Sequence, residues 1–349
     1  MSHLSKKQKD IITIFSVGIA FGFAYPLNSD GLEKAGPIIN GFVIGLLGSG
    51  FIVLNEIIIN KNWIRKMNFR ALVAYKTLIY FSFFALLIPI VVSITRSMDL
   101  NLSLKEFVDQ GHLDFFLFHD DYHIILLYAL FGTLLFIFTY QMSRKMGQGV
   151  LFGFITGKYH KPREQKLITM FIDMNDSTNI AEKLGDEQFN LLLKNFFFDI
   201  TDSITNNYGN IYRYVGDEIA ITWKADNSFK SDLLANTFYQ AKNALEARYG
   251  FYQRKFGLRP RFTAGCHYGK AIVGEIGEIK SQICILGQVM FETTAIEKSC
   301  KTFDAEFLMS DKLLRKYPIN NTYEANHKGD VELNGKSINV FSIVPKDSL

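Results

Sequence analysis

The chain has 349 residues, of which 48% are hydrophobic, and its formal net charge is +4. That length favours two domains over one. The mild charge, without basic runs interleaved by aromatics in the C-terminal part, argues against nucleic acid as a partner.

Four segments in the first 145 residues are apolar over lengths that suit a membrane helix. They cover residues 11–27, 37–59, 71–95 and 123–142. Lysines precede the first segment as in a signal peptide, but three further spans follow and no small-residue cleavage site is obvious, so we expect an anchor. The sequence therefore predicts a four-span membrane domain over residues 1–145.

Loop charges predict the orientation of these spans. The loop between the second and third spans is basic, and so is the exit from the fourth: Lys61, Arg65, Lys66, Arg70, Arg144 and Lys145. The first and third loops are mainly acidic. Since positive loops stay in the cytoplasm, we expect a multi-pass protein of the inner (cytoplasmic) membrane with both termini and the soluble part in the cytosol.

Two ionisable residues fall inside the predicted spans. Glu56 and Lys76 lie on consecutive spans, each near the cytoplasmic end. We expect them to pair or to reach the interface, while ligand sensing is the alternative. Gly41, Gly45 and Gly48 share one face of the second span, which favours close helix packing there.

A glycine-rich linker over residues 146–164 precedes a soluble domain over residues 165–349. In this domain we expect a strand at 167–174, a helix at 180–206, a hairpin at 211–223, a helix at 232–256, a strand pair across 261–277 and a final hairpin at 331–344. Strands alternating with helices of roughly 20 residues predict an α/β or α+β sheet with helices on one face.

Two strand-like apolar runs in this domain meet an aspartate. Asp173 ends the first run, and Asp217 lies 44 positions later in the turn of the first hairpin. Paired carboxylates at the ends of neighbouring strands suit two divalent cations that grip a nucleoside triphosphate. The simpler alternatives are a helix N-cap for Asp173 and a turn residue for Asp217.

These residues belong to an ordered set of motifs. It comprises Phe171-Ile172-Asp173 with Ser177-Thr178, then Gly216-Asp217-Glu218, then His267-Tyr268-Gly269 and Val273-Gly274-Glu275-Ile276-Gly277. The set resembles class III nucleotide cyclases over residues 160–317. The resemblance implies a ferredoxin-like α+β domain, a homodimer with composite active sites, and a membrane domain ahead of the cyclase as in several bacterial members.

The reaction implied by this resemblance is attack of a ribose 3′-oxygen on the α-phosphorus of the same nucleotide, with release of pyrophosphate. It implies two Mn²⁺ or Mg²⁺ ions held by Asp173, Asp217 and the backbone carbonyl of Met174. The turn from the first strand into the following helix suits the triphosphate, because exposed backbone N–H groups bind anions. Its residues are Asn175, Asp176, Ser177 and Thr178; the last two are alternatively helix caps.

The base-reading positions depart from the family pattern. Adenylate cyclases carry Lys and Asp at the two positions, and guanylate cyclases carry Glu and Cys. This sequence has Arg213 and Cys284. Arginine donates several hydrogen bonds and accepts none, which suits O2 and N3 of cytosine or a carbonyl of uracil. The alternative for Arg213 is an outward strand residue paired with a carboxylate.

The family's transition-state asparagine and arginine fall at Phe291 and Ala295, which donate no hydrogen bond. Losing one such donor typically costs about 10²–10³ in rate. Lys298 and Lys301 follow on the same expected helix, and either reaches the phosphates or stays on a solvated face. Retention of both aspartates favours a divergent enzyme over an inactive one.

Altered base positions beside an intact metal pair are similar to the pyrimidine cyclases of Pycsar antiviral defence. We therefore expect a membrane-anchored nucleotide cyclase that prefers CTP or UTP and makes a second messenger for an effector protein. An adenylate or guanylate cyclase and a catalytically silent nucleotide-binding or dimerisation module remain the alternatives.

Overall fold

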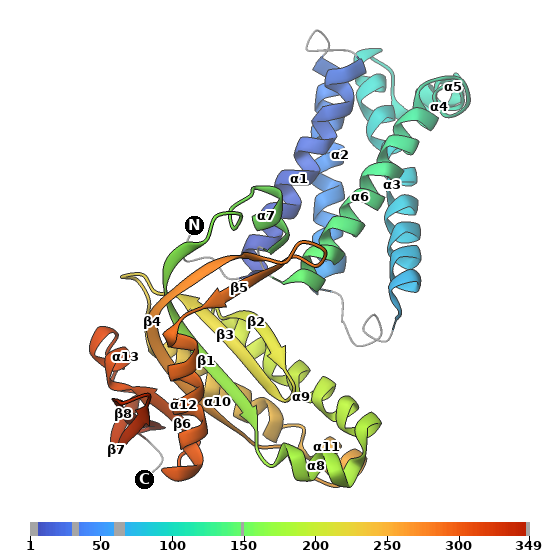
Figure 1. Cartoon of the computed structure of the whole chain (residues 1–349). Coiled ribbons are helices and arrows are strands. Elements are labelled where there is room, and N and C mark those ends of the chain that lie inside the picture. The colour runs from blue at the N-terminus through green and yellow to red at the C-terminus, as the bar shows by residue number, and fades with distance from the viewer. Residues whose placement is uncertain (1–5, 30–34, 59–66, 148–149, 347–349) are drawn as a thin grey trace. The chain divides into compact units, whose positions relative to one another are not determined.

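The computed structural model describes residues 6–29, 35–58, 67–147 and 150–346. Contacts divide the chain into two compact units, Met1–Lys145 and Met146–Leu349. Each unit is described by itself. Figure 1 shows helices alone in the first unit and a sheet with helices in the second.

The first unit is built from long helices. They are α1 (Lys6–Ser29), α2 (Ala35–Val53), which the π-helical turn η1 (Leu54–Ile58) extends, α3 (Phe69–Asp99) and α6 (Tyr122–Met146). Three of them are long and apolar enough to cross a membrane: Ala35–Glu56, Phe69–Asp99 and Tyr122–Met146. The predicted first span is helical, but its apolar part covers only Asp10–Ala24. Three of the four predicted spans are thus supported.

The glycine face predicted on α2 packs closely against α1. A Cβ atom on Gly45 would lie 2.6 Å from the backbone oxygen of Gly18, and a Cβ on Gly41 would meet the backbone of Gly22. Gly18 and Gly22 supply a matching small-residue face, which the sequence analysis did not single out. Small residues of this kind let helix backbones approach within the membrane.

Filling this contact is expected to destabilise the membrane unit. Gly41→Leu places a side chain against backbone and should lower the free energy of unfolding by about 1–3 kcal/mol, the usual effect of overpacking. Gly50→Leu on the same helix is the matched control, because its Cβ has no neighbour nearer than 4.0 Å. Thermal unfolding of the two full-length variants measures the difference, and equal melting temperatures would contradict the packing role.

The predicted pairing of Glu56 with Lys76 is confirmed. Their side chains form a buried ion pair, and the Tyr80 hydroxyl also donates to Glu56 Oε1 at 2.9 Å. This pair links η1 to α3. The lysine and the tyrosine hydroxyl together satisfy the buried carboxylate, as a charge inside a membrane requires.

The acidic segment after α3 is structured. It forms two short helices, α4 (Leu104–Asp109) and α5 (His112–His119), and Asp120 pairs with Arg96 at 2.5 Å. The charges of the first loop, at residues 30–34, and the basic residues at 61–66 lie outside the described residues. The described contacts therefore leave the orientation a prediction.

The second unit contains a mixed sheet with helices. Its elements are α7 (Val150–Ile155), β1 (Arg163–Met174), α8 (Ser177–Leu184), α9 (Asp186–Asn206), β2 (Asn210–Val215), β3 (Glu218–Lys224), α10 (Asp232–Glu246), α11 (Tyr249–Phe256), β4 (Phe262–Ile276), β5 (Gln282–Leu286), α12 (Gln288–Thr302), β6 (Phe307–Ser310), α13 (Asp311–Lys316), β7 (Tyr323–Leu333) and β8 (Lys336–Pro345). The strand order is β2-β3-β1-β4-β6-β8-β7, and β5 pairs with β4.

The strands from β1 to β4 follow βαββαβ connectivity, and β1 pairs antiparallel with both β3 and β4. This is the connectivity of a ferredoxin-like fold. Strand β1 reads as a continuous apolar run because both of its faces are buried. Ile168 and Ile172 face a core closed by α9 and α10, whereas Leu167 and Phe171 face a smaller core that includes Val289 of α12.

Several predicted boundaries were wrong. The helix expected at 180–206 breaks at Gly185, whose φ of 73° is unfavourable for residues with a Cβ. The helix expected at 232–256 is divided at Ala247 and Arg248 into α10 and α11. The expected strand pair across 261–277 is the single strand β4, whose partner is β5. The final hairpin is confirmed, with Asn334-Gly335 between β7 and β8.

The end of the predicted linker is integrated into the sheet. Strand β1 begins at Arg163, the Tyr159 carbonyl accepts from the Glu275 amide at 2.9 Å, and Glu164 pairs with Lys270 at 2.8 Å. Glycines in this stretch did not prevent a short helix, α7. The cyclase-like sheet therefore starts a few residues before the predicted position.

Candidate active site

The two aspartates singled out in the sequence lie together. Asp173 is the penultimate residue of β1 and is opposite Glu218, the first residue of β3. Asp217 occupies the two-residue turn just before that strand, after Gly216 with a φ of 63°. The fold thus brings the two carboxyl groups within hydrogen-bond contact although they are 44 positions apart in the sequence.

The carboxyl groups around this aspartate pair favour binding of a cation. Burial first, and then the hydrogen bond and negative charge of Asp217, raise the pKa of Asp173 to about 7. Glu297 and Glu218 act in the same direction. Two half-buried carboxyl groups in contact are a site that a divalent cation would stabilise, since a bound cation favours their ionised forms.

The donor set fits Mg²⁺ or Mn²⁺, both of which prefer oxygen ligands. Met174 has a buried side chain, so only its backbone carbonyl is available as a further ligand. Among the described residues no group of three or more His, Cys, Asp or Glu side chains is arranged to hold a metal. A cation site here therefore rests on two carboxylates, the backbone and groups brought by a substrate.

The turn after β1 presents a helix N-terminus beside this pair. Asp176, with a φ of 56°, is the N-cap of α8 and makes no side-chain capping bond. Ser177 and Thr178 are the first helical residues, so the cap alternative for them was wrong. Backbone N–H groups in the first turn of α8 remain available to an anion. The Asn175 amide instead bonds the Arg261 carbonyl at 3.0 Å.

The two predicted base-reading positions belong to strands that do not pair with each other, β2 and β5. Arg213 follows a bulge in β2, and Cys284 lies in the middle of β5. The backbone amide of Ile285 donates to the Tyr212 hydroxyl at 2.9 Å, which joins the residues next to both positions. Arg213 is exposed, acts on Glu218 through its charge and forms no ion pair among the described residues. Cys284 lies opposite Gly274, at the end of β4 away from the Thr263 that pairs with Asp173, so the two predicted positions are linked only through Tyr212 and Ile285.

Glu297 is a site residue that the sequence analysis missed. It is 3% exposed, on the inward face of α12, and accepts a hydrogen bond from Thr263 Oγ1 at 2.8 Å. Thr263 pairs with Asp173 across the sheet and lies 3.3 Å from the Asn175 side chain. Burial raises the pKa of Glu297, whereas the Thr263 hydrogen bond and the charges of Lys298 and Lys301 lower it. The sequence signal that could have identified Glu297 is a carboxylate at a helix position where the neighbouring inward residues are apolar.

The side chains at the family's transition-state positions differ in exposure. Phe291 is 69% exposed on α12, and Ala295 packs against the apolar cluster of Ile296 and Val340. Lys298 is exposed, and its charge lowers the pKa values of Glu218 and Glu297. A cation is thus present near the carboxylates, although Phe291 and Ala295 offer no donor.

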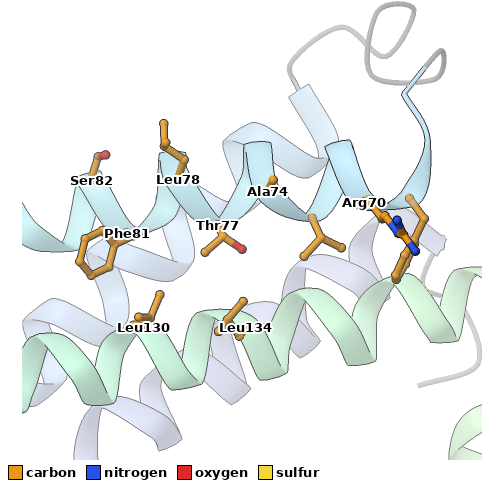
Figure 2. A pocket seen from close by; sticks show the side chains of 10 residues that line it. Arg70, Ala74, Thr77, Leu78, Phe81, Ser82, Leu130 and Leu134 are labelled. Atoms are coloured by element: carbon orange, nitrogen blue, oxygen red, sulfur yellow. The ribbon is translucent and has the colours of Figure 1, made fainter.

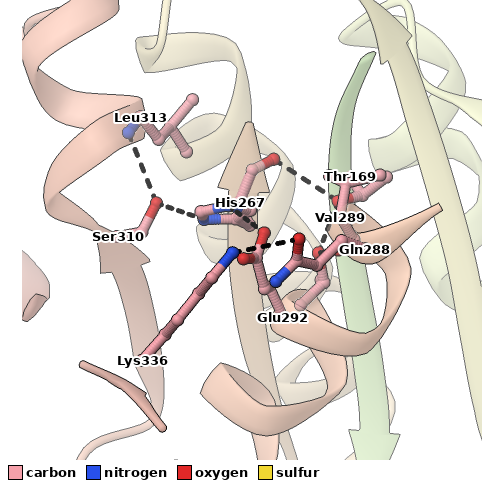
Figure 3. Close-up of polar contacts among 9 residues, drawn as sticks. Thr169, His267, Gln288, Val289, Glu292, Ser310, Leu313 and Lys336 are labelled. Carbon is pink, nitrogen blue, oxygen red and sulfur yellow. Dashed lines mark hydrogen bonds and ion pairs between the residues drawn. The ribbon is translucent and has the colours of Figure 1, made fainter. Parts of the chain in front are cut away.

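A buried polar network fixes α12 to the sheet (Figure 3). His267 of β4 is 2% exposed; its Nδ1 lies 2.7 Å from Ser310 Oγ, and its Nε2 lies 2.9 Å from Glu292 Oε2. The latter atoms are within ion-pair range but are not aligned as a hydrogen bond. Thr169 and Thr293 hydroxyls meet at 2.5 Å on the same helix face. These contacts set the rotation of the helix that carries Phe291 and Glu297.

This network predicts acid sensitivity. Burial, followed by the charge of Lys312, lowers the pKa of His267 to about 3. In the unfolded state this histidine is protonated below about pH 6.5, whereas in the folded state it stays neutral. The free energy of unfolding therefore falls as the pH drops from 7 to 5, by about 1.4 kcal/mol per pH unit below 6.5.

The measurement is thermal unfolding at pH 7 and pH 5. We expect His267→Gln to lose about 2 kcal/mol less than the wild type between these values. His160→Gln, at an exposed position, should behave as the wild type. Identical pH dependence of wild type and His267→Gln would show that folding does not lower the pKa of His267.

No family model matches the chain. The chain is 30% identical over 212 residues to Adenylate cyclase 2 of Rhizobium meliloti (strain 1021), a match that covers 61% of this chain and 58% of that relative. The chain thus spans less than two thirds of that relative's length.

Two solved structures are similar. A bacterial light-regulated adenylyl cyclase has a TM-score of 0.52 at 16% identity, covering 61% of this chain and 64% of that chain. The guanylyl cyclase Cya2 has a TM-score of 0.46 at 20% identity, covering 54% and 97%. The first likeness shows that the second unit has the fold of a cyclase domain, as the motif resemblance predicts.

Proposed function

We propose that the chain is a membrane-anchored nucleotide cyclase. The observation that carries the proposal is the aspartate pair: the side chains of Asp173 and Asp217 lie within hydrogen-bond contact, within a fold similar to that of an adenylyl cyclase. The named relative, an adenylate cyclase, supports the same reaction class.

The proposed reaction is an intramolecular displacement. The ribose 3′-oxygen forms a bond to the α-phosphorus, the bond from that phosphorus to the bridging α–β oxygen breaks, and pyrophosphate leaves with the electron pair. The 3′-hydroxyl proton passes to solvent or to a basic group. The product is a 3′,5′-cyclic nucleoside monophosphate.

Asp173, Asp217 and the Met174 carbonyl would hold two Mg²⁺ or Mn²⁺ ions. Such ions, when bound, acidify an attacking hydroxyl and neutralise phosphate charge. The chain's own residues position the substrate: N–H groups at the start of α8 bind the triphosphate, and Lys298 adds a cation beside it. Glu297, through Thr263, holds the strand segment opposite Asp173.

We further propose that the preferred base is a pyrimidine. Arg213 presents donors without an acceptor, which suits cytosine O2 and N3 or a uracil carbonyl. Cys284 in β5 does not supply the carboxylate that reads adenine in adenylate cyclases. Cyclisation of ATP or GTP is the alternative, and the adenylate cyclase relative favours ATP.

The remaining parts of the proposal concern assembly and location. Exposed apolar side chains on α12, β5 and the strand β4 support a homodimer with composite active sites: Ile272, Ile276, Leu286 and Phe291. Three membrane-length helices support anchoring, with the cyclase unit and both termini in the cytosol. The cyclic product would act on an effector protein, in antiviral defence if the pyrimidine assignment holds.

One assay tests the function. Purified full-length protein with Mn²⁺ is incubated separately with ATP, GTP, CTP and UTP, and the products are identified by mass spectrometry. We expect cyclic CMP or cyclic UMP as the main product. Faster turnover of ATP or GTP would refute the base preference, and absence of any cyclic nucleotide would refute the enzyme and favour a silent module.

A further inference from the structure

The membrane unit contains an apolar groove that none of the features above uses. It has a volume of about 710 Å³ and lies between α3 and α6. Figure 2 shows Arg70 at one end, Ser82 and Phe81 at the other, and Leu130 and Leu134 of α6 facing α3. The α3 residues recur at helical spacing, so they form one continuous face.

The length of the groove matches one bilayer leaflet. Arg70 and Ser82 are separated by twelve positions of α3, which corresponds to about 18 Å at 1.5 Å per residue. The hydrocarbon core of a bilayer is about 30 Å thick, so a leaflet contributes roughly half of that. An extended acyl chain that starts at the Arg70 end would therefore run along the whole groove.

Two cations lie at the Arg70 end. Arg70 is exposed in the first turn of α3. Lys145, in the last turn of α6, lies 4.5 Å from the ring centroid of Phe69, which also lines the groove. Within the described ranges neither cation has an ion-pair partner, and the sequence from Ile59 to Asn68 contains no carboxylate. An anionic group at this end would complement both charges.

One polar atom lies deeper in the groove. The hydroxyl oxygen of Thr77 is buried and has no hydrogen-bond partner among the described residues. A buried hydroxyl without a partner is unfavourable. A ligand with an oxygen acceptor below a charged headgroup would satisfy it, whereas a purely hydrocarbon chain would not.

We propose that this groove binds one anionic phospholipid, with an acyl chain along α3 and α6 and the headgroup phosphate against Arg70 and Lys145. The proposal rests on the proposed placement of this unit in a membrane. It does not depend on catalysis by the second unit. A glycerophospholipid supplies every complementary feature: the phosphate for the cations, the ester oxygen for Thr77, and the chain for the apolar lining.

The test is native mass spectrometry of the detergent-purified full-length protein, titrated with phosphatidylglycerol or with phosphatidylcholine of the same acyl chains. We expect the wild type to retain one phosphatidylglycerol at a concentration about fivefold lower than phosphatidylcholine, the contribution of a cation near an anionic headgroup. Ala74→Phe, which fills the groove, should weaken binding of both lipids. Arg70→Gln should reduce the preference for phosphatidylglycerol, because only Lys145 then faces the phosphate.

Matched controls lie outside the groove. Leu86→Phe enlarges an exposed residue of α3, and Lys105→Gln removes an exposed cation of α4; both should bind lipid as the wild type. The proposal is overturned if Arg70→Gln keeps the wild-type preference or if Ala74→Phe binds lipid like Leu86→Phe. A shift from dimer to monomer in Ala74→Phe without loss of lipid would assign the groove to a second copy instead. Lipid binding is measured without nucleotide, so its result does not depend on whether the protein has cyclase activity.

Discussion

Replacing Asp173 by alanine is expected to reduce cyclic nucleotide formation by about 10³-fold or more. The variant removes one of the two carboxylates on which the proposed cation site depends, and metal-assisted stabilisation of a transferring phosphoryl group contributes several kcal/mol. Asp217→Ala should have a similar effect. The measurement is kcat with saturating Mn²⁺ and the preferred nucleotide, followed by product quantification.

The double variant makes this prediction more specific. If both aspartates serve one site, removing both should cost little more than removing one, because the first substitution already disables the site. Asp202→Ala, at an exposed position of α9, is the matched control and should retain full activity. Removal of the buried charge repulsion should also leave the variants at least as stable as the wild type, so a loss caused by unfolding is recognisable in a thermal melt.

This variant also separates an enzyme from a silent module. A module that acts by dimerisation or nucleotide binding would keep its biological effect in Asp173→Ala, and its wild type would form no cyclic product. Undiminished catalysis in the variant would instead show that the aspartate pair is structural. Either result would refute the proposed role of the pair.

Much of the second unit was predictable because local pattern and fold agree. The run from Leu167 to Met174 is apolar at every position except Thr169 and Asp173, and the strand is buried on both faces. A polar residue at the end of such a strand therefore marks a site. The hairpin turns at Gly216-Asp217 and Asn334-Gly335 were equally clear, since both place glycine where φ is positive.

What the sequence did not reveal depends on long-range packing. Gly185 was read as a residue within one helix, but nothing local shows that α9 must change direction there to cover the sheet. Glu297 was missed because its partner, Thr263, is 34 positions away. The contact of Gly41 with Gly22 likewise needs two helices to be seen, as one glycine stripe does not identify the other.

The sequence predicted which two residues read the base, but not how their strands are connected. The sequence indicated Arg213 and Cys284 separately, and the structure adds the hydrogen bond between Tyr212 and the Ile285 amide that holds their strands together. The bulge beside Arg213 also determines which way the following residues face. The two positions are therefore exchanged together to test base selection.

Exchanging the two residues should change the nucleotide preference. Arg213→Lys with Cys284→Asp installs the pair found in adenylate cyclases: an ammonium donor and a carboxylate that accepts from the adenine amino group. Two new hydrogen bonds to charged groups, each of about 1.5 kcal/mol, should raise the ratio of kcat/KM for ATP over CTP by about 10². Initial rates with each nucleotide at limiting concentration give that ratio directly.

The single variants decide whether the two positions act together. Cys284→Asp alone introduces a carboxylate while Arg213 stays, so the two positions match no purine pattern and activity with every nucleotide should fall. Adding Arg213→Lys should recover ATP turnover, which is a coupling that independent sites would not show. Arg254→Lys, an exposed substitution on α11, controls for the arginine-to-lysine change. If the double variant keeps the wild-type ratio, base selection lies elsewhere, and exposed Phe291 on α12 becomes the residue to examine, because its ring is free to stack on any base.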